Sequence, residues 1–149
     1  MTVVEDAREL LQLGELSGIR FNGFSAERIA GGEPVTDEEQ AEQSIQVSIG
    51  QNPGLIEVRV QLELTTSAAK YVADAASQYR YPDDHEVSEE VARQFAEAVG
   101  VMAVYPYLRE LVQTSSARLS LPPVTLPLMR QGEVNLSPKD ESVDLASAD

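Results

Sequence analysis

The most constraining feature of the chain is a run of alternating apolar and polar residues between positions 45 and 64. Only the sequence Gln-Asn-Pro-Gly at 51–54 interrupts it, with Pro and Gly at the two central positions of a type II turn. A period of two with a charged second face is typical of antiparallel strands that have one side in water. The run therefore predicts an antiparallel hairpin and argues against a parallel βαβ unit.

Two further segments extend the predicted sheet. Residues 71–81 continue the alternation in a later strand, and residues 19–26 form an earlier one. The apolar parity of the earlier strand changes at Gly23, which predicts a β-bulge, with a mobile glycine as the alternative. A short helix over residues 4–11 that stops at Gly14 precedes it. These segments predict four antiparallel strands with one face that needs a cover.

The second half of the chain supplies this cover. Ser88 followed by two glutamates is typical of a helix N-cap and first turn, and apolar residues at helical spacing follow from Val91 to Leu119. Pro106 lies inside this pattern and predicts either a kink or the start of a second segment. The predicted fold class is α+β: a four-stranded antiparallel sheet covered on one face by a long Pro-kinked helix and a short C-terminal helix.

The long helix has more apolar residues than one sheet requires. In the run 101–112 only Arg109 and Glu110 are charged. A helix that covers one sheet needs a single apolar stripe, and this one has nearly two. The surplus predicts either an interface with another copy of the chain or an unusually deep core. Its members are Val101, Val104, Leu108 and Leu111.

Composition sets the broad class of the protein. With 149 residues, 42% hydrophobic and 24% charged, the chain suits one globular domain, residues 1–138, followed by a disordered acidic tail, residues 139–149. A net charge of −14 repels nucleic-acid phosphates and anionic lipids and favours cationic or unfolded polypeptides as partners. The chain shows neither a signal sequence nor a membrane-spanning run, so we expect a cytoplasmic protein without membrane insertion.

Motifs for catalysis or metal binding are not found. The chain has no cysteine, and its one histidine, His85, has only Asp83, Asp84 and Glu86 nearby, too few ligands of the right type for structural zinc. No serine lies in a Gly-x-Ser-x-Gly elbow, and no Gly-Lys-Ser/Thr follows Gly31-Gly32. We therefore expect no enzyme, no metal and no cofactor. A small α+β ligand-binding or enzyme domain is the alternative from another class.

One stretch is distinctive. The sequence Val-Tyr-Pro-Tyr-Leu-Arg-Glu at 104–110, followed by Leu-Pro-Pro at 121–123 and a Leu-rich segment, resembles the SecB family of bacterial export chaperones. The similarity is good over residues 104–138 and only architectural over 17–81. The predicted order of strands and helices agrees with it independently. The residues that match the family motif are Tyr105, Pro106, Tyr107, Arg109, Glu110 and Pro122.

The resemblance implies an ATP-independent holdase that keeps non-native polypeptides unfolded for protein export. It also implies a dimer of dimers in which first strands pair and long helices lie between two sheets, which assigns the surplus helix residues to an oligomer interface. Clients of the family lie in apolar grooves beside the sheet, the crossover loop and the last helix. The matching residues are Val35, Ile45, Val47, Ile49, Leu126, Leu128 and Met129, with ordinary core as the alternative for each.

The chain departs from the family at the beginning of the first strand. General export members have acidic residues there that dock the basic tail of the SecA motor, whereas this chain has Gly18, Arg20 and Asn22. This difference argues against SecA as the partner. A subgroup of the family instead protects the antitoxin of a toxin–antitoxin pair, and the N-terminal helix suits that subgroup. The expected partner is therefore SecA or an antitoxin.

Overall fold

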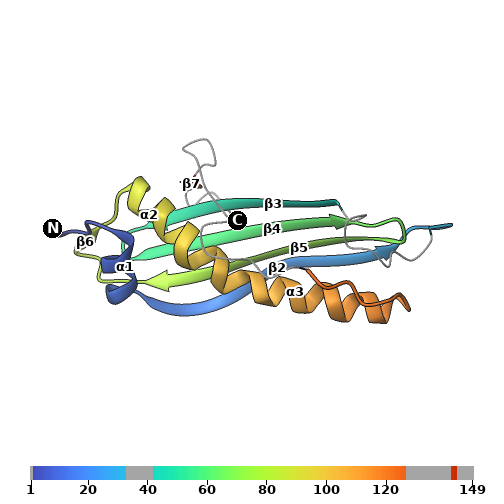
Figure 1. Cartoon of the computed structure of the whole chain (residues 1–149). Coiled ribbons are helices and arrows are strands. Elements are labelled where there is room, and N and C mark those ends of the chain that lie inside the picture. Colours follow the sequence, from blue (N-terminus) through green and yellow to red (C-terminus); the bar gives the residue numbers. More distant parts are fainter. Residues whose placement is uncertain (1, 33–41, 127–141, 144–149) are drawn as a thin grey trace.

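A computed structural model of the chain describes residues 2–32, 42–126 and 142–143. Its main feature is an antiparallel sheet of four long strands, β2 (Glu15–Arg28), β3 (Glu42–Asn52), β4 (Leu55–Thr65) and β5 (Ala69–Arg80). Their order is β2-β5-β4-β3, and the helices lie on one face of the sheet (Figure 1). The predicted α+β fold is confirmed.

Strands β3 and β4 form the hairpin that the alternating run predicts. They pair without a register shift from Glu42 opposite Thr65 to Asn52 opposite Leu55. In the connecting turn Gly54 has a φ of 75°, the left-handed value that a type II turn requires at this position. The turn therefore fixes which side chains of the two strands face the helices.

Strand β2 is an edge strand with two irregularities. Its register with β5 shifts between Leu16 and Gly18, and again between Phe21 and Gly23. The second shift is the bulge that the parity change at Gly23 predicts. Bulges bend an edge strand and change the direction of its side chains. Among the described residues no strand pairs with the outer edge of β2.

The N-terminal residues pack on one end of the sheet. Two short strands, β1 (Thr2–Val3) and β6 (His85–Glu86), pair in parallel. Helix α1 (Ala7–Leu13) begins at Asp6, whose side chain accepts a hydrogen bond from the Glu9 N–H, and it ends before Gly14 as predicted. Leu10 of this helix is completely buried.

Three consecutive segments form the long helix: α2 (Glu89–Phe95), the π-helix η2 (Ala96–Gly100) and α3 (Val101–Arg118). Ser88 caps its beginning and accepts a hydrogen bond from the Val91 N–H at 3.2 Å, as predicted. Helix α3 continues through Pro106, so the alternative of a restart at this proline is wrong. The irregular segment of the helix is η2, which precedes Pro106.

The π-helix changes which residues face the sheet, because a π turn contains more residues than an α turn. In a regular α-helix Ala92 and Val104 would be about 120° apart around the axis. With η2 between them, both are buried, at 1% and 0% exposure. Ala98 and Met102, which regular spacing predicts to be buried, are only half-buried. Sequence periodicity therefore misplaces Ala98 and Met102, whereas Tyr105, at the same spacing, is buried as predicted.

Gly100, the last residue of η2, lies directly against β4. A Cβ atom at this position would lie within 2.8 Å of all three side-chain carbons of Val58. The Ser77 hydroxyl of β5 donates a hydrogen bond to the Gly100 carbonyl at 3.2 Å. From this contact the helix crosses the sheet diagonally and ends beside β2 (Figure 1). The diagonal path leaves the first halves of β2 and β3 without a helix above them.

The chain reverses direction after α3. Ser120 has a φ of 60°, and residues 121–126 run back along the helix (Figure 1). The predicted short C-terminal helix, the boundary at residue 138 and most of the tail 139–149 lie outside the described residues. Within that tail, β7 (Ser142–Val143) pairs in parallel with β3 at Ile49 and Gly50.

We expect Gly100→Ala to lower the free energy of unfolding by about 1–3 kcal/mol, the usual cost of overfilling a packed core. Urea denaturation followed by circular dichroism measures this change. Gly18→Ala in β2 is the matched control, because a Cβ there has no neighbour within 4 Å. The control should change stability by less than about 0.5 kcal/mol. Equal effects of the two substitutions would contradict the close contact at Gly100.

Candidate functional site

The predicted client-binding residues of β3 lie on the helix side of the sheet. Ile45 and Val47 are half-buried, and Ile49 is 3% exposed. Ile45 pairs with Leu62 and Val47 with Val60, and both partners are buried core residues. Ile49 is therefore ordinary core, whereas Ile45 and Val47 form an incompletely covered apolar strip at the edge of the sheet.

The predicted client-binding residues outside β3 are only partly described. Leu126 is 2% exposed and packs in the same core cluster as Ile49. The other three, Val35, Leu128 and Met129, lie outside the described residues. The structure therefore places Leu126 in the core of the helix side of the sheet.

The predicted oligomer-interface residues have two different environments. Val101, Val104 and Leu108 are completely buried in the core cluster between the helix and the sheet of the same chain. Contacts within one chain are therefore enough to bury these three side chains. Leu111 is half-buried. Of the predicted set, only Leu111 is accessible to another chain in this conformation.

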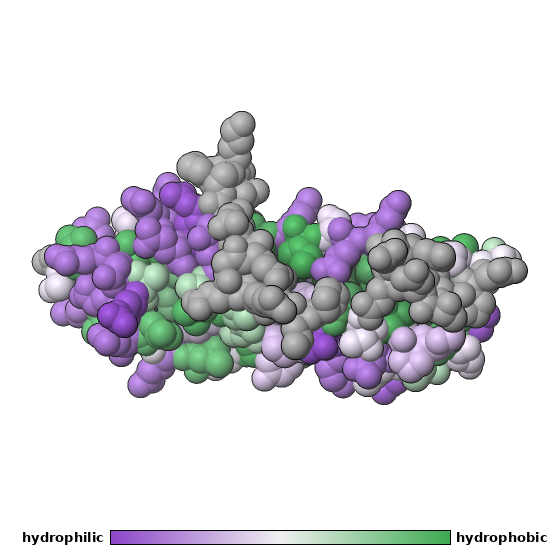
Figure 2. Space-filling view, in the orientation of Figure 1, coloured by the Kyte–Doolittle hydropathy of each residue, from purple (hydrophilic) through white to green (hydrophobic). Residues whose placement is uncertain are grey.

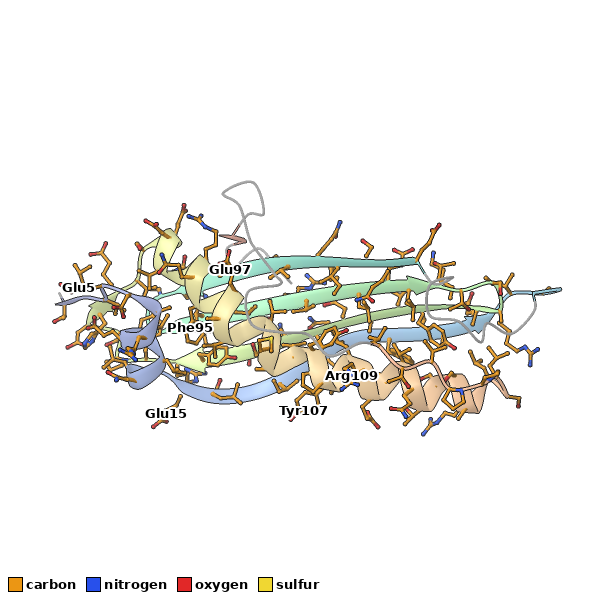
Figure 3. All side chains as sticks on the ribbon, viewed as in Figure 1. Glu5, Glu15, Phe95, Glu97, Tyr107 and Arg109 are labelled. Atoms are coloured by element: carbon orange, nitrogen blue, oxygen red, sulfur yellow. The ribbon has the colours of Figure 1, made fainter. Side chains whose placement is uncertain are left out.

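Sequence analysis missed an exposed apolar strip on the helix side of β2. Leu16 is 54% exposed, Phe21 48% and Phe24 38%, although all three pair with buried residues of β5. Phe21 packs edge-on against Tyr107 of α3, with ring centroids 6.1 Å apart. Apolar side chains gather in the left half of the lower edge of Figure 2, and Figure 3 labels Tyr107 near the middle of that edge. The change in the apolar alternation at Gly23 is the sequence signal that could have predicted this strip.

The face of the sheet opposite the helices carries paired charges. Arg20 Nη2 lies 2.7 Å from Glu57 Oε1, and only 6% of the Glu57 side chain is exposed. Arg59 binds Asp74 through two nitrogens, one of them Nε at 2.8 Å from Oδ1. Asn22 also donates to Asp74 at 3.1 Å. The acids at the centre of this face are thus engaged with bases of the same chain.

The structure shows no arrangement for metal binding in its described part. His85 lies in β6, and its Nδ1 is 2.8 Å from Asp84 Oδ1. No group of three potential ligands exists within residues 2–32, 42–126 and 142–143. No helix in these same ranges is long and apolar enough to span a membrane.

Comparison with known proteins identifies the family to which the chain belongs. No protein-family model matches it. A curated relative, the SecB-like chaperone SmegB of Mycolicibacterium smegmatis, is 37% identical over 142 residues, which are 95% of this chain and 91% of that protein. The chain belongs to the SecB-like chaperones.

A solved SecB-like structure has the same fold. It is the Mycobacterium tuberculosis Rv1957 SecB-like chaperone in complex with a ChAD peptide from the Rv1956 HigA1 antitoxin. It superposes with a TM-score of 0.69 at 22% identity, over 83% of this chain and 93% of that one. The fold and the family assignment therefore agree.

The residues of the SecB-like sequence motif have different environments in α3. Tyr105 is buried at 3% exposure, and Arg109 Nε donates a hydrogen bond to the Leu126 carbonyl at 2.8 Å. The others, Pro106, Tyr107, Glu110 and Pro122, are exposed. Arg109 is thus the motif residue that fixes the path of the chain after the helix (Figure 3).

Asp74 is the most strongly engaged acid in the described part of this SecB-like chain. Burial alone would raise the pKa of its carboxyl, but hydrogen bonds from Arg59, Asn22 and Gln61 and the charge of Arg59 hold the pKa below its ordinary value of 3.8. Because the folded-state pKa is the lower one, the carboxylate stabilises the fold above the ordinary value. This stabilisation is lost as the pH falls through the folded-state pKa.

We expect Asp74→Asn to lower the free energy of unfolding at neutral pH by about 1–3 kcal/mol, because charge-assisted hydrogen bonds are lost. The difference from the wild type should disappear in strong acid, where Asp74 is protonated in both states. Urea denaturation of both proteins across a pH series measures this difference in stability. Glu63→Gln is the control, since the Glu63–Lys70 pair is about half exposed on both sides. A difference that does not change with pH would contradict the assignment.

Proposed function

We propose that this SecB-like chaperone is an ATP-independent holdase that binds non-native polypeptides through apolar contacts along the helix side of β3. The observation that supports this most directly is the half-buried pair Ile45 and Val47 on that strand. Ordinary core residues next to Val60 and Leu62 would be fully covered. An incompletely covered aliphatic strip offers an unfolded chain apolar area to bury without selecting a particular sequence.

The proposed activity needs no nucleotide, metal or covalent step, and we infer that the protein is not an enzyme. Burial of apolar area supplies the free energy of binding, at about 25 cal/mol per Å². The net charge of −14 adds long-range attraction for cationic clients in the cytoplasm, where we expect the protein to act. Salt should slow the association of such clients more than it shortens their bound lifetime.

An antitoxin is the client class that we favour. The related Rv1957 chaperone holds a peptide from an antitoxin. Docking on SecA for general export, the other role of the family, is less well supported, because Arg20 at the beginning of β2 pairs with Glu57 and leaves this acid little exposed. Tight, salt-sensitive binding of a basic SecA-tail peptide in calorimetry would overturn this preference.

We also infer that the protein assembles with further copies of itself through the β2 edge. The outer edge of β2 has no partner strand among the described residues, and Leu16, Phe21 and Tyr107 beside it are about half exposed. Exposed apolar residues along an unpaired edge strand are typical of an interface. A second copy would bury them and pair the edge, which is the first step towards a dimer of dimers.

We expect the wild-type protein to suppress aggregation of a reduced, unfolded protein in the absence of nucleotide, as measured by light scattering. Replacing both Ile45 and Val47 by Ser should weaken client binding by about tenfold, because two aliphatic contacts are lost. Val72→Ser is the matched control, since Val72 is 37% exposed on the opposite face. No suppression by the wild type would instead favour a small ligand-binding or enzyme domain.

Tyr107→Glu should split the assembly into smaller particles, because burying an unpaired carboxylate at an interface costs several kcal/mol. Sedimentation velocity at micromolar concentration measures the particle size, and circular dichroism checks that the chain stays folded. Val72→Glu is the control, with an equal change of charge on the other face. A wild-type monomer, or equal behaviour of the two variants, would exclude the β2 strip as an interface.

A further inference from the structure

The residues that follow the long helix contact it through their backbone. The Val124 N–H donates a hydrogen bond to Ser116 Oγ at 3.1 Å, and Arg109 Nε donates to the Leu126 carbonyl at 2.8 Å. Residues two apart in an extended chain direct their backbone groups to the same edge. Both hydrogen bonds are therefore made to backbone groups on one edge of residues 121–126. They place no requirement on the type of side chain at position 124.

The two helix residues are suited to hold any extended segment. Arg109 and Ser116 are two turns apart on α3, a separation of about 10.5 Å along the axis. The Ser116 hydroxyl donates its own proton to the Gln113 carbonyl at 2.8 Å, so its oxygen is left as an acceptor for an N–H. Arg109 supplies a donor for a carbonyl. Together they match the donor and acceptor of a peptide backbone.

The sheet beneath Ser116 contains a buried hydroxyl group without a hydrogen-bond partner in the described part of the chain. Tyr71 of β5 is 1% exposed, and its hydroxyl has no hydrogen bond of normal geometry among the described residues. Burial raises the pKa of the Tyr71 hydroxyl. A buried phenol without a hydrogen bond is costly, and residues 121–126 supply no carbonyl to it, so a client carbonyl that reaches it would gain a contact that these residues lack.

The sequence of residues 121–126 indicates which client peptides would fit in their place. Leu121 and Leu126 are 8% and 2% exposed, whereas Pro122, Pro123 and Thr125 are exposed. The pattern is two large aliphatic residues five positions apart, without charge between them. The residue two positions before the second anchor must have an N–H, which excludes proline there.

We propose that Arg109, Ser116 and Tyr71 form a binding strip for extended, uncharged client segments, and that residues 121–126 occupy this strip until a client displaces them. The proposal rests on the holdase function and names a site for it. The tethered occupant has an effective concentration of about millimolar. A client segment therefore competes only when further contacts, such as those along β3, hold the same client.

Hydrogen exchange in the full-length wild-type protein tests the displacement directly. Addition of a saturating reduced, unfolded client should speed amide exchange at Val124 by at least about tenfold, because this N–H loses its partner when the occupant leaves. The amide of Val60 in the central strand β4 is the internal control and should not change. Unaltered or stronger protection of Val124 with the client bound would overturn the proposal.

A peptide assay tests the strip without any client protein. The probe is a fluorescent peptide with the sequence of residues 119–126, and the control peptide carries an N-methyl group on its valine. Leu126→Asp in the full-length chain should weaken the occupant and raise probe affinity about tenfold over the wild type. The N-methyl probe, and Ser116→Ala added to that variant, should each remove this gain.

The two assays separate this proposal from the holdase function. If the protein suppresses aggregation but Val124 stays protected with the client bound, only the strip is wrong. If it does not suppress aggregation but binds the probe with the expected dependence on Ser116, the strip stands and the holdase function is wrong. Equal binding of the probe and its N-methyl form by a folded variant would overturn the strip.

Discussion

The long helix can lie directly on the sheet because the strand beneath it has small side chains. Ala73, Ala75 and Ser77 form the middle of the helix side of β5, and each is at most 1% exposed. Large side chains flank them, including Tyr79, which packs edge-on against Phe95 with centroids 4.8 Å apart. Small residues where the helix crosses the sheet, and large residues beside them, fix both the distance of the helix from the sheet and its direction.

The diagonal path of the helix determines where apolar residues remain uncovered. Because the helix lies on β4 at Gly100 and ends beside β2, it does not cover the first half of either edge strand. On β3 the incompletely covered residues are Ile45 and Val47, and on β2 the exposed ones include Leu16 and Phe21. The proposed surfaces for clients and for other copies are thus both results of one packing geometry.

Local signals in the sequence predict most of the fold, whereas long-range contacts decide the rest. A period of two does not drift along a strand, so the buried faces of β4 and β5 follow from alternation alone. The ends of helices at Ser88 and Gly14 depend on neighbouring residues. The pair Arg20–Glu57 joins residues 37 positions apart, and the contact of Arg109 with Leu126 requires the reversal at Ser120. Neither follows from a local pattern.

The π-helix η2 keeps the buried faces of α2 and α3 aligned although it contains one residue more than regular α-helical spacing needs. Loss of a single residue there would restore an ordinary α-helix without breaking either end. Ala92 and Val104 would then be eleven positions apart, about 20° around the axis, and both would still face the sheet. Loss of one residue from the regular part of α3 would instead rotate all later residues by about 100°. In the described part of the long helix, η2 is thus the place where a change of length leaves the buried face intact.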